Sequence, residues 1–443
     1  MKTILLTACL VLLFGVLFGF STASIAGVVD AIAADFSLST RATEMVVTAL
    51  LLGCFAGAAA AAPVSQRIGR RPSCLVAACL AALGYALVPG GQMLAPGAGT
   101  LAAARILIGL GVGLSSMVVP MYAAEVTPAR HRGAVVSLFQ LAITIGILVG
   151  YAVPLALTGL VSWQGMLASG LLMAAACAAS VLLLPESPRW LKARGQAAQA
   201  QAAAEVLGIT SEMSEEPVAE GDWRAALRQG STVAVLALCS ALFILQNFSG
   251  IDGILYYAPR IFTELGFPQG TAALAATFGL GLVNVLATVA ALLLVDRLGR
   301  RPLLIAGSAA MAASLAAVIA ASLADWPFVA LGGFCFYIVA FALSLGPLPY
   351  VLMSELFPTA VRERGIAVAS ATSWLFNGIV AGTFLSVVQG IGLAATIGIF
   401  FAVCVISLAV AVLFVPETRR VELEAIEADV LAGRPLRELG MEA

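Results

Sequence analysis

The sequence has few charged residues, a single histidine and no cysteines at the spacing of metal ligands. Only 11% of its 443 residues are charged, whereas 61% are hydrophobic, and a water-soluble globular chain has about 25% charged residues. So few charges cannot cover a surface that faces water, and we therefore expect most of the surface to face lipid. The net charge of −1 argues against nucleic-acid binding.

The scarcity of metal ligands argues against a metal centre. His131 is the only histidine and lies in a basic loop, and the eight cysteines are scattered through apolar segments without metal-ligand spacing. No nucleophile, base and orienting group form a catalytic set, and no phosphate-binding glycine loop follows a strand. We therefore expect neither an enzyme nor a cofactor.

Long apolar runs fill most of the chain. A membrane-spanning helix needs about 20 mostly apolar residues, and twelve segments meet this requirement. The connections between them are short, except for a polar stretch between the sixth and the seventh. The predicted spans are 4–28, 43–64, 73–90, 99–123, 133–158, 163–184, 231–258, 271–295, 302–323, 327–351, 365–388 and 392–415.

Three motifs recur at an offset of 230 or 231 residues, which indicates two related halves. QRIGRRP from Gln66 matches DRLGRRP from Asp296, EVTPARHRG matches ELFPTAVRERG, and PESPRW matches PETRRV. Constant spacing predicts a duplicated six-helix unit. The expected fold is an all-α polytopic membrane protein with helical bundles at 1–184 and 231–415, a linker with short helices at 185–230 and a tail at 416–443.

Basic residues gather in alternate connections. If the amino terminus is cytoplasmic, Arg41, Arg105 and Arg260 are the only ones of the 23 lysines and arginines that fall outside the cytoplasmic segments. Cytoplasmic loops are enriched in lysine and arginine. We therefore expect both termini and the linker on the cytoplasmic side of the cell membrane.

These motifs resemble the sugar porter family of the major facilitator superfamily. The matches are GRR after the second and eighth spans, PESPR and PETRR after the sixth and twelfth, QNFSGIDGILYY in the seventh and GPLPYVLMSELFP in the tenth. The resemblance covers nearly the whole chain and implies transport of a sugar, expected to be a monosaccharide, by alternating access. We expect a monomer that binds the sugar and the lipid bilayer, with protons as a candidate second cargo.

The resemblance also implies a gating role for charged residues at the cytoplasmic helix ends. Arginines and glutamates there can pair and hold the inner gate shut while the cavity opens outward; alternatively, the arginines are only topology signals. An uncharged Gln66 stands where the second copy has an aspartate, so we predict a weaker lock in the first half. The implied residues are Arg67, Arg71, Glu125, Arg132, Glu186, Asp296, Arg297, Arg301, Glu355, Arg362 and Glu417.

Polar residues inside the spans indicate a central cavity, because such residues are costly in lipid and usually face the bundle interior. The seventh span is the richest, and its glycines, Gly250 and Gly253, permit a break in the helix. Amide side chains donate and accept hydrogen bonds, as sugar hydroxyls do. The polar residues of this span are Gln246, Asn247, Ser249 and Asp252.

The family resemblance implies sugar contacts at positions in both halves. Tyr350 takes the place of a tryptophan that often stacks on the sugar, and Ser373 that of an amide, so the particular sugar stays open. Tyr256 and Tyr257 match tyrosines near the outer gate. Without the resemblance, the amides are interhelical contacts and the aromatics are packing. The implied sugar contacts are Phe18, Gln140, Gln246, Asn247, Asp252, Asn284, Tyr350, Ser373, Trp374 and Asn377.

The sequence leaves proton coupling open. Proton-coupled family members typically carry an aspartate in the first span near an arginine in the fourth, whereas here Ser21 replaces the acid and Arg105 is retained. Serine cannot carry a proton as a carboxylate does, so uniport is the simpler interpretation. Asp252, where many members have asparagine, supports symport instead, because desolvation favours a neutral carboxyl group. It could also simply bind sugar hydroxyls or pair with an arginine.

Other cargoes and roles are alternatives to sugar transport. A polyol, a cyclic carboxylate such as quinate, or a drug could replace the sugar, and Arg105 could attract an anion. A sugar sensor that binds without transporting usually has a long cytoplasmic extension, whereas the tail at 416–443 is short.

Overall fold

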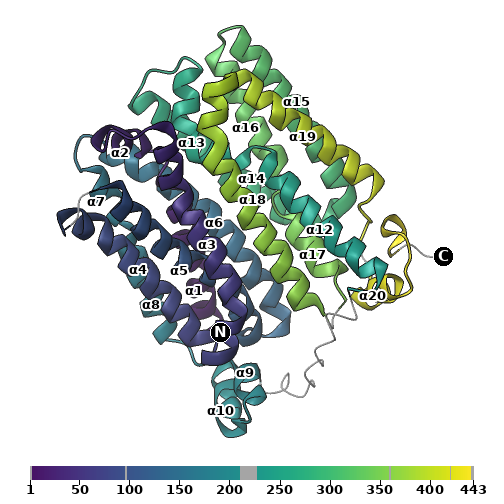
Figure 1. The fold of residues 1–443 in the computed structure, drawn as a ribbon. Helices are drawn as coiled ribbons and strands as arrows, with labels where there is room; N and C mark the ends of the chain where they lie inside the picture. Colours follow the sequence, from purple (N-terminus) through teal and green to yellow (C-terminus); the bar gives the residue numbers. More distant parts are fainter. Residues whose placement is uncertain (1, 95–96, 210–226, 359–360, 420, 441–443) are drawn as a thin grey trace. The chain divides into compact units, whose positions relative to one another are not determined.

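Helices form every described element of the chain (Figure 1). The computed structural model describes residues 2–94, 97–209, 227–358, 361–419 and 421–440. The chain divides into two compact units, unit 1 at Met1–Glu216 and unit 2 at Pro217–Ala443. The division falls within the stretch that the sequence identifies as a linker.

Twelve helical segments of the described chain are long and apolar enough to cross a membrane, which confirms the predicted number. Six lie in unit 1 and six in unit 2. In unit 1 the helices are α1 (Lys2–Ala23), α2 (Val29–Asp35), α3 (Thr40–Ile68), α4 (Arg70–Leu94), α5 (Ala98–Val126), α6 (Ala129–Leu157), α7 (Trp163–Ala168), α8 (Gly170–Leu182), α9 (Pro188–Ala193) and α10 (Ala197–Leu207).

Helices α3 and α5 approach each other closely through glycines. A Cβ atom added to Gly109 would lie 2.0 Å from the carbonyl oxygen of Leu50, and one added to Gly113 would lie 2.0 Å from that of Cys54. On α3, Gly53 is crowded against α5 in the same way. Small residues at this spacing let helix backbones pack tightly in a membrane. They join α3 and α5 into one seam of unit 1.

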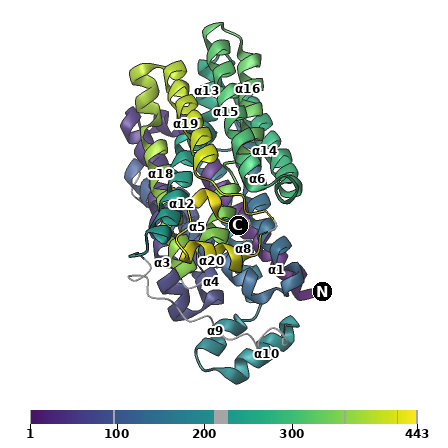
Figure 2. The ribbon, with the colours of Figure 1, turned by 90° about the vertical axis from the view of Figure 1, so that its right-hand side faces the viewer.

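The first part of the linker folds as two short helices that belong to unit 1. Figure 2 shows α9 and α10 beyond the ends of the membrane-spanning helices of this unit. Helix α10 forms in the Ala/Gln-rich segment where the sequence predicts a surface helix, and it ends at Gly208, whose φ of +71° suits a helix stop. Its buried face, including Ala200 and Ala203, packs against Leu191 of α9.

Unit 2 repeats the arrangement but contains two broken spans. The first break separates α12 from α13, and the second separates α16 from α17. The elements are α12 (Gly230–Phe248), α13 (Ile251–Glu264), α14 (Thr271–Leu298), α15 (Arg300–Leu323), α16 (Pro327–Leu343), α17 (Leu348–Leu356), α18 (Arg362–Ile391), α19 (Leu393–Leu413), α20 (Leu423–Leu431) and η3 (Leu436–Glu438).

The segment predicted as a tail is folded against unit 2. Helix α20 packs on α12 and α17, and η3 packs on α12. Ile426, Val430 and Leu439 are fully or almost fully buried there. The tail is therefore part of the second bundle's core.

Candidate functional site

The seventh span is broken at Gly250, one of the two glycines at which the sequence permits a break. Helix α12 ends at Phe248 and α13 begins at Ile251, with Gly250 between them at a φ of +97°. A Cβ atom at Gly250 would lie 2.2 Å from the ring of Phe400, so no larger residue fits. Breaks within a span free backbone groups from helical hydrogen bonding, and transporters build binding sites at them.

Gln246 connects this break to the second one. Its Nε2 donates hydrogen bonds to the carbonyl oxygens of Leu345 at 2.8 Å and Gly346 at 2.9 Å, which lie between α16 and α17. The side chain is buried. The amide nitrogen therefore donates within the protein, and a ligand hydroxyl would donate its hydrogen bond to the amide oxygen.

Asn247, Ser373 and Tyr350 come together from three helices of unit 2. The Nδ2 of Asn247 donates to the Phe243 carbonyl at 2.7 Å and to the Ser373 hydroxyl at 3.3 Å. Ser373 also hydrogen-bonds the Tyr350 hydroxyl. The Tyr350 ring stands edge-on to Phe243 with centroids 4.8 Å apart, yet it is 45% exposed. Hydroxyl, amide and an exposed ring edge thus lie side by side.

A second polar chain joins α13 to α18. The Tyr256 hydroxyl donates to Oδ1 of Asn377 at 3.2 Å, and the Asn377 side chain hydrogen-bonds the Asp252 carboxylate. Asp252 is partly buried and lies in the first turn of α13. Ser373 and Asn377 are four residues apart on α18, so they face the same side of that helix. We call the following six residues the unit 2 polar cluster: Asn247, Asp252, Tyr256, Tyr350, Ser373 and Asn377.

Other residues singled out by the sequence lie around this cluster or in unit 1. Tyr257 is buried, stacks on Phe384 with centroids 5.2 Å apart and donates to the Ala381 carbonyl at 2.9 Å. In unit 1, Phe18 packs edge-on against Phe139. The remaining implied contacts are Trp374 next to Ser373 on α18, Asn284 buried on α14, and Gln140 half-buried on α6.

Hydroxyl groups occupy the place in unit 1 where the family pattern has an acid. The Ser21 and Tyr85 hydroxyls lie 2.7 Å apart, and Ser21 also donates to the Leu17 carbonyl at 2.6 Å. The buried Arg105 donates to backbone carbonyls of α3, from Nε to Val46 at 2.8 Å and from Nη2 to Val47 at 3.2 Å. Arg105 therefore ties α5 to α3.

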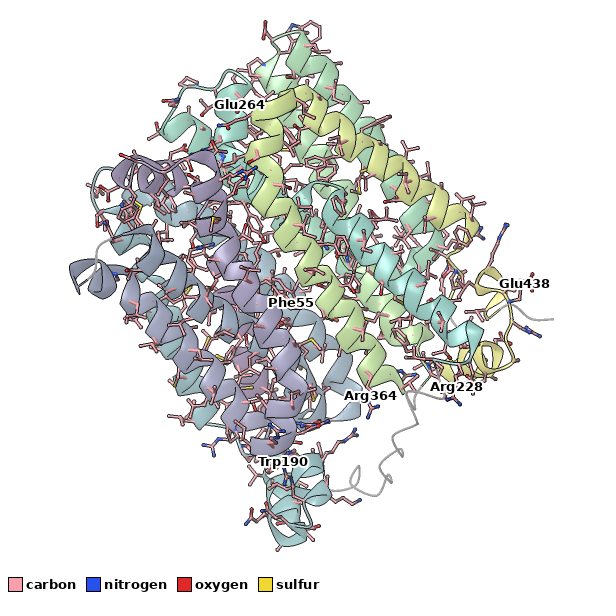
Figure 3. The ribbon with its side chains drawn as sticks, viewed as in Figure 1. Phe55, Trp190, Arg228, Glu264, Arg364 and Glu438 are labelled. Atoms are coloured by element: carbon pink, nitrogen blue, oxygen red, sulfur yellow. The ribbon has the colours of Figure 1, made fainter. Side chains whose placement is uncertain are left out.

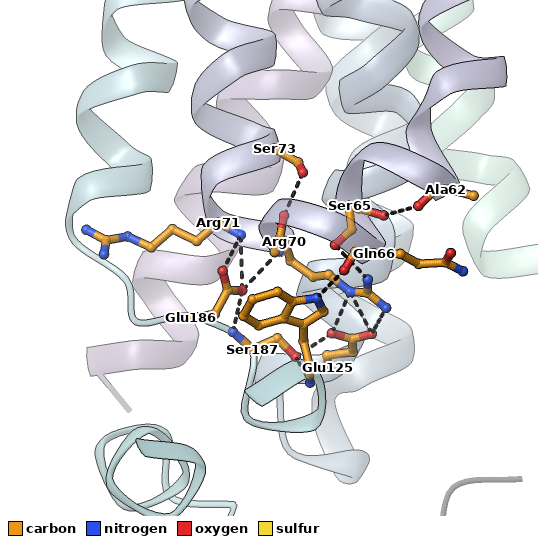
Figure 4. Close-up of polar contacts among 11 residues, drawn as sticks. Ala62, Ser65, Gln66, Arg70, Arg71, Ser73, Glu125, Glu186 and Ser187 are labelled. Atoms are coloured by element: carbon orange, nitrogen blue, oxygen red, sulfur yellow. Dashed lines mark hydrogen bonds and ion pairs between the residues drawn. The ribbon is translucent and has the colours of Figure 1, made fainter. Parts of the chain in front are cut away.

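Charged residues form a compact network at one end of unit 1 (Figure 4). The Arg70 guanidinium pairs with the Glu125 carboxylate at 3.2 Å, and the Ser187 hydroxyl donates to that carboxylate. The Glu186 carboxylate accepts the backbone N–H groups of Arg70 at 3.0 Å and Arg71 at 3.1 Å. These five residues are the first GRR cluster, and they join α4, α5 and the segment after α8.

Unit 2 contains the same network at the repeated motifs. Arg300 pairs with Glu355 at 2.9 Å, and the Thr418 hydroxyl donates to Glu355 at 2.5 Å. Glu417 accepts the backbone N–H groups of Arg300 at 3.1 Å and Arg301 at 3.2 Å. This second GRR cluster therefore repeats the ion pair, the hydroxyl contact and the two backbone contacts of the first.

Sequence reasoning missed the two arginines that make these ion pairs, Arg70 and Arg300. Arg67 and Arg297, which it named instead, are exposed. Arg71 donates through its guanidinium to the carbonyls of Val181 and Leu182, both at 3.2 Å, and its counterpart Arg301 reaches the Val412 carbonyl at 2.9 Å. The available signal was the first arginine of GRR, which is present in both copies.

The other residues of the predicted gate are placed as follows. The Nε of Arg362 donates to the Phe357 carbonyl at 3.1 Å. Gln66 is exposed, and in Figure 4 its side chain points away from Glu125. The side chains of Arg132 and Asp296 lie outside the described residues.

Comparison with known proteins places this geometry among sugar carriers. The family described as "Sugar (and other) transporter" matches residues 7–430. The galactose-proton symporter of Escherichia coli (strain K12) is 34% identical, over 97% of this chain and 94% of that protein, and the arabinose-proton symporter of the same strain is 32% identical, over 96% and 93%. The structure of the E. coli xylose transporter XylE in a partially occluded inward-open conformation superposes with a TM-score of 0.80 at 33% identity, covering 94% of this chain and 99% of that one.

Proposed function

Because the chain belongs to the sugar transporter family, we propose that it carries a monosaccharide together with a proton across the cell membrane, as a monomer, by alternating access between its two halves. The observation that carries this proposal is the unit 2 polar cluster, in which amide and hydroxyl groups meet at breaks within membrane spans. Relatives named for galactose and arabinose support a monosaccharide as the cargo.

The chemistry of the cluster suits an uncharged ligand with many hydroxyl groups. Asn247 and Ser373 offer a hydrogen-bond donor and acceptors, and the exposed part of Tyr350 offers an aromatic edge against a sugar ring. Asp252 is its one acidic residue, and these six residues include no cation that could bind a cyclic carboxylate. Arg105, the cation that could attract an anion, is bound to backbone carbonyls of α3. The cluster therefore favours a sugar over a carboxylate.

Proton coupling is supported by the names of the relatives and by Asp252. The sequence by itself made uniport the simpler interpretation, because Ser21 replaces an acid. The galactose and arabinose relatives, which match over 94% and 93% of their length, are named proton symporters, and Asp252 supplies a carboxylate in a membrane span. These two observations favour symport over uniport.

The two GRR clusters serve, in this proposal, as the cytoplasmic locks of their bundles. Figure 3 shows Arg228 and Arg364 at one end of unit 2 and Glu264 at the other. Because cytoplasmic ends are enriched in basic residues, the end with Arg228 and Arg364 is assigned to the cytoplasm, with both termini on that side. Glutamate–arginine pairs there would strengthen and loosen as the bundles change their contacts during the cycle.

Counterflow in proteoliposomes tests the transport function directly. Proteoliposomes that contain the purified protein and are preloaded with unlabelled D-galactose, L-arabinose or D-xylose should take up the same labelled sugar transiently. Proteoliposomes preloaded with sorbitol or quinate should not take up the corresponding labelled compound. Asn247→Ala should slow counterflow about tenfold, the effect of losing one or two hydrogen bonds to the ligand. Thr372→Ala, one residue from Ser373 and bonded to its own helix, is the matched control. Binding of a sugar without counterflow would instead make the protein a sensor.

A further inference from the structure

Asp252 is the one carboxylate in the twelve described spans that lies away from a span end. The other acidic residues of these spans fall within the first or last two turns: Glu44, Glu125, Glu264 and Glu355. An acidic side chain inside a membrane is costly, and where it occurs it usually marks a pathway for protons or ions. The position of Asp252 therefore indicates a functional role rather than a structural one.

We infer that Asp252 is the group that binds and releases the coupled proton, on the opposite half of the protein from Ser21. This inference rests on the proposed symport. The Ser21 hydroxyl is engaged with Tyr85 and Leu17 and does not ionise near neutral pH. Within the described spans, Asp252 is the carboxyl group that also contacts the residues proposed to hold the sugar.

The surroundings of Asp252 leave its carboxyl group able to change protonation state. Ion pairs among the described residues do not include it. Helices α12 and α14 contain no Asp, Glu, Lys, Arg or His within their spans, and those of α18 lie in its first turn. The titratable groups near Asp252 are tyrosines from its own helix and from α16 and α17: Tyr256, Tyr337 and Tyr350. An arginine partner would hold the carboxylate charged, and no ion pair between Asp252 and an arginine is found in the part of the chain that the structure describes.

The position of Asp252 at the helix break supports both of its forms. In the first turn of α13 it lies beside backbone N–H groups that stabilise an anion. Asn377 adds a hydrogen bond to the carboxylate, and a protonated carboxyl could donate to the amide oxygen instead. The backbone here is held by close packing, since Gly250 lies against Phe400 and Gly253 against Phe384.

The same contacts connect proton binding to sugar binding. Asn377 links Asp252 to Tyr256, and Ser373, one turn earlier on the same face of α18, links to Asn247 and Tyr350. A change at Asp252 therefore alters the contact between α13 and α18 on which the sugar groups depend. Proton and sugar would act on the same helix pair.

The proton step balances without any other reactant. From the outward-facing state, a proton from water forms an O–H bond with a carboxylate oxygen of Asp252, and the side chain becomes neutral. In the inward-facing state that O–H bond breaks, the proton passes to water, and the carboxylate is restored. Each cycle moves one proton with one sugar.

Sugar-induced alkalinisation of a weakly buffered cell suspension measures this step. Wild-type protein should raise the external pH when its sugar is added, and Asp252→Asn should abolish the signal. Asparagine is common at this position in the sugar porter family, so Asp252→Asn should fold. If Asp252→Asn does not fold, Asp252→Ser provides the same test. Counterflow, which needs no net proton movement, should continue in the variant, slowed at most about tenfold by one changed hydrogen bond.

A matched control variant and the possible contrary results decide whether Asp252 carries the coupled proton. Glu264→Gln removes an exposed acid from the same helix and should leave alkalinisation intact. Full alkalinisation by folded Asp252→Asn would overturn the assignment of Asp252 while leaving sugar–proton symport standing. Counterflow by the wild type without any alkalinisation would overturn symport itself, and the absence of counterflow would overturn transport.

Discussion

The carboxylate of Glu186 accepts the backbone N–H of Arg70 at 3.0 Å, although the two residues are 116 positions apart in the chain. A side chain from beyond α8 therefore caps the first turn of α4. Helix N-termini have free N–H groups and a partial positive charge, so a carboxylate there satisfies both.

Replacing this cap should lower stability measurably. Glu186→Gln keeps the shape of the side chain but removes its charge, and we expect a loss of about 1–2 kcal/mol. The midpoint of thermal unfolding in detergent should fall by about 2–4 °C for each kcal/mol. Glu205→Gln, at an exposed position of α10, should change it by less than about 0.5 kcal/mol. Equal shifts in the two variants would contradict the capping role.

The Arg70–Glu125 pair should show energetic coupling in a double-mutant cycle. Arg70→Gln, Glu125→Gln and the double variant should give a coupling energy of about 1 kcal/mol or more, because the two side chains share several hydrogen bonds and are largely buried. The same cycle with the exposed Arg67 in place of Arg70 is the control and should give a value near zero. Thermal or denaturant unfolding supplies the measurement, and coupling to Arg67 instead would refute the pairing seen here.

The glycine seam between α3 and α5 should not tolerate even one methyl group. Gly109→Ala would place a Cβ atom 2.0 Å from the Leu50 carbonyl oxygen, which forces the helices apart and should cost about 1–3 kcal/mol. Gly279→Ala on α14 meets nothing within 4 Å and should be neutral or slightly stabilising. Folded yield and thermal stability after purification compare the two directly; similar behaviour would mean that the seam does not hold the helices.

Gln246→Glu should damage the connection between the two broken spans. The substitution puts an oxygen in place of the nitrogen that now donates to Leu345 and Gly346, so three acceptors would face one another in a buried site. An unsatisfied buried polar group costs about 1–3 kcal/mol, and transport should fall about tenfold or more. Gln389→Glu, exposed near the end of α18, should transport normally. Undiminished counterflow by Gln246→Glu would argue that the contact is not needed.

The sequence predicted the spans and the first helix break because both have strong local signals. Apolar runs of membrane length mark the spans, and Gly250 marks the break at a position where a side chain would strike Phe400. The break between α16 and α17 went unpredicted because the apolar run from 327 to 351 is long enough to cross a membrane, although Gly346, Pro347 and Pro349 are residues that interrupt helices. Local sequence gives no sign there that the buried Gln246 amide donates hydrogen bonds to the carbonyl groups of Leu345 and Gly346.

The partners within each GRR cluster could not be deduced in the same way. Arg67, Arg70 and Arg71 are close in sequence and identical in charge, and only the direction of each side chain from its helix end decides which one meets Glu125. Gly69, with a φ of +102°, separates α3 from α4, and α4 then begins at Arg70, whose side chain meets Glu125 of α5. That direction depends on the packing of three helices rather than on the motif.

The folded tail extends the internal repeat beyond the two GRR clusters. Helix α20 follows Glu417 and Thr418 of the second GRR cluster, just as α9 and α10 follow Glu186 and Ser187 of the first. Each copy of the repeat therefore ends in a short helical segment that packs on its own unit: α9 and α10 contact α5 and α1, and α20 contacts α12 and α17. A truncation before Leu423 would remove α20 and expose apolar surface on α12 and α17, so an affinity tag should leave the residues up to Gly440 in place.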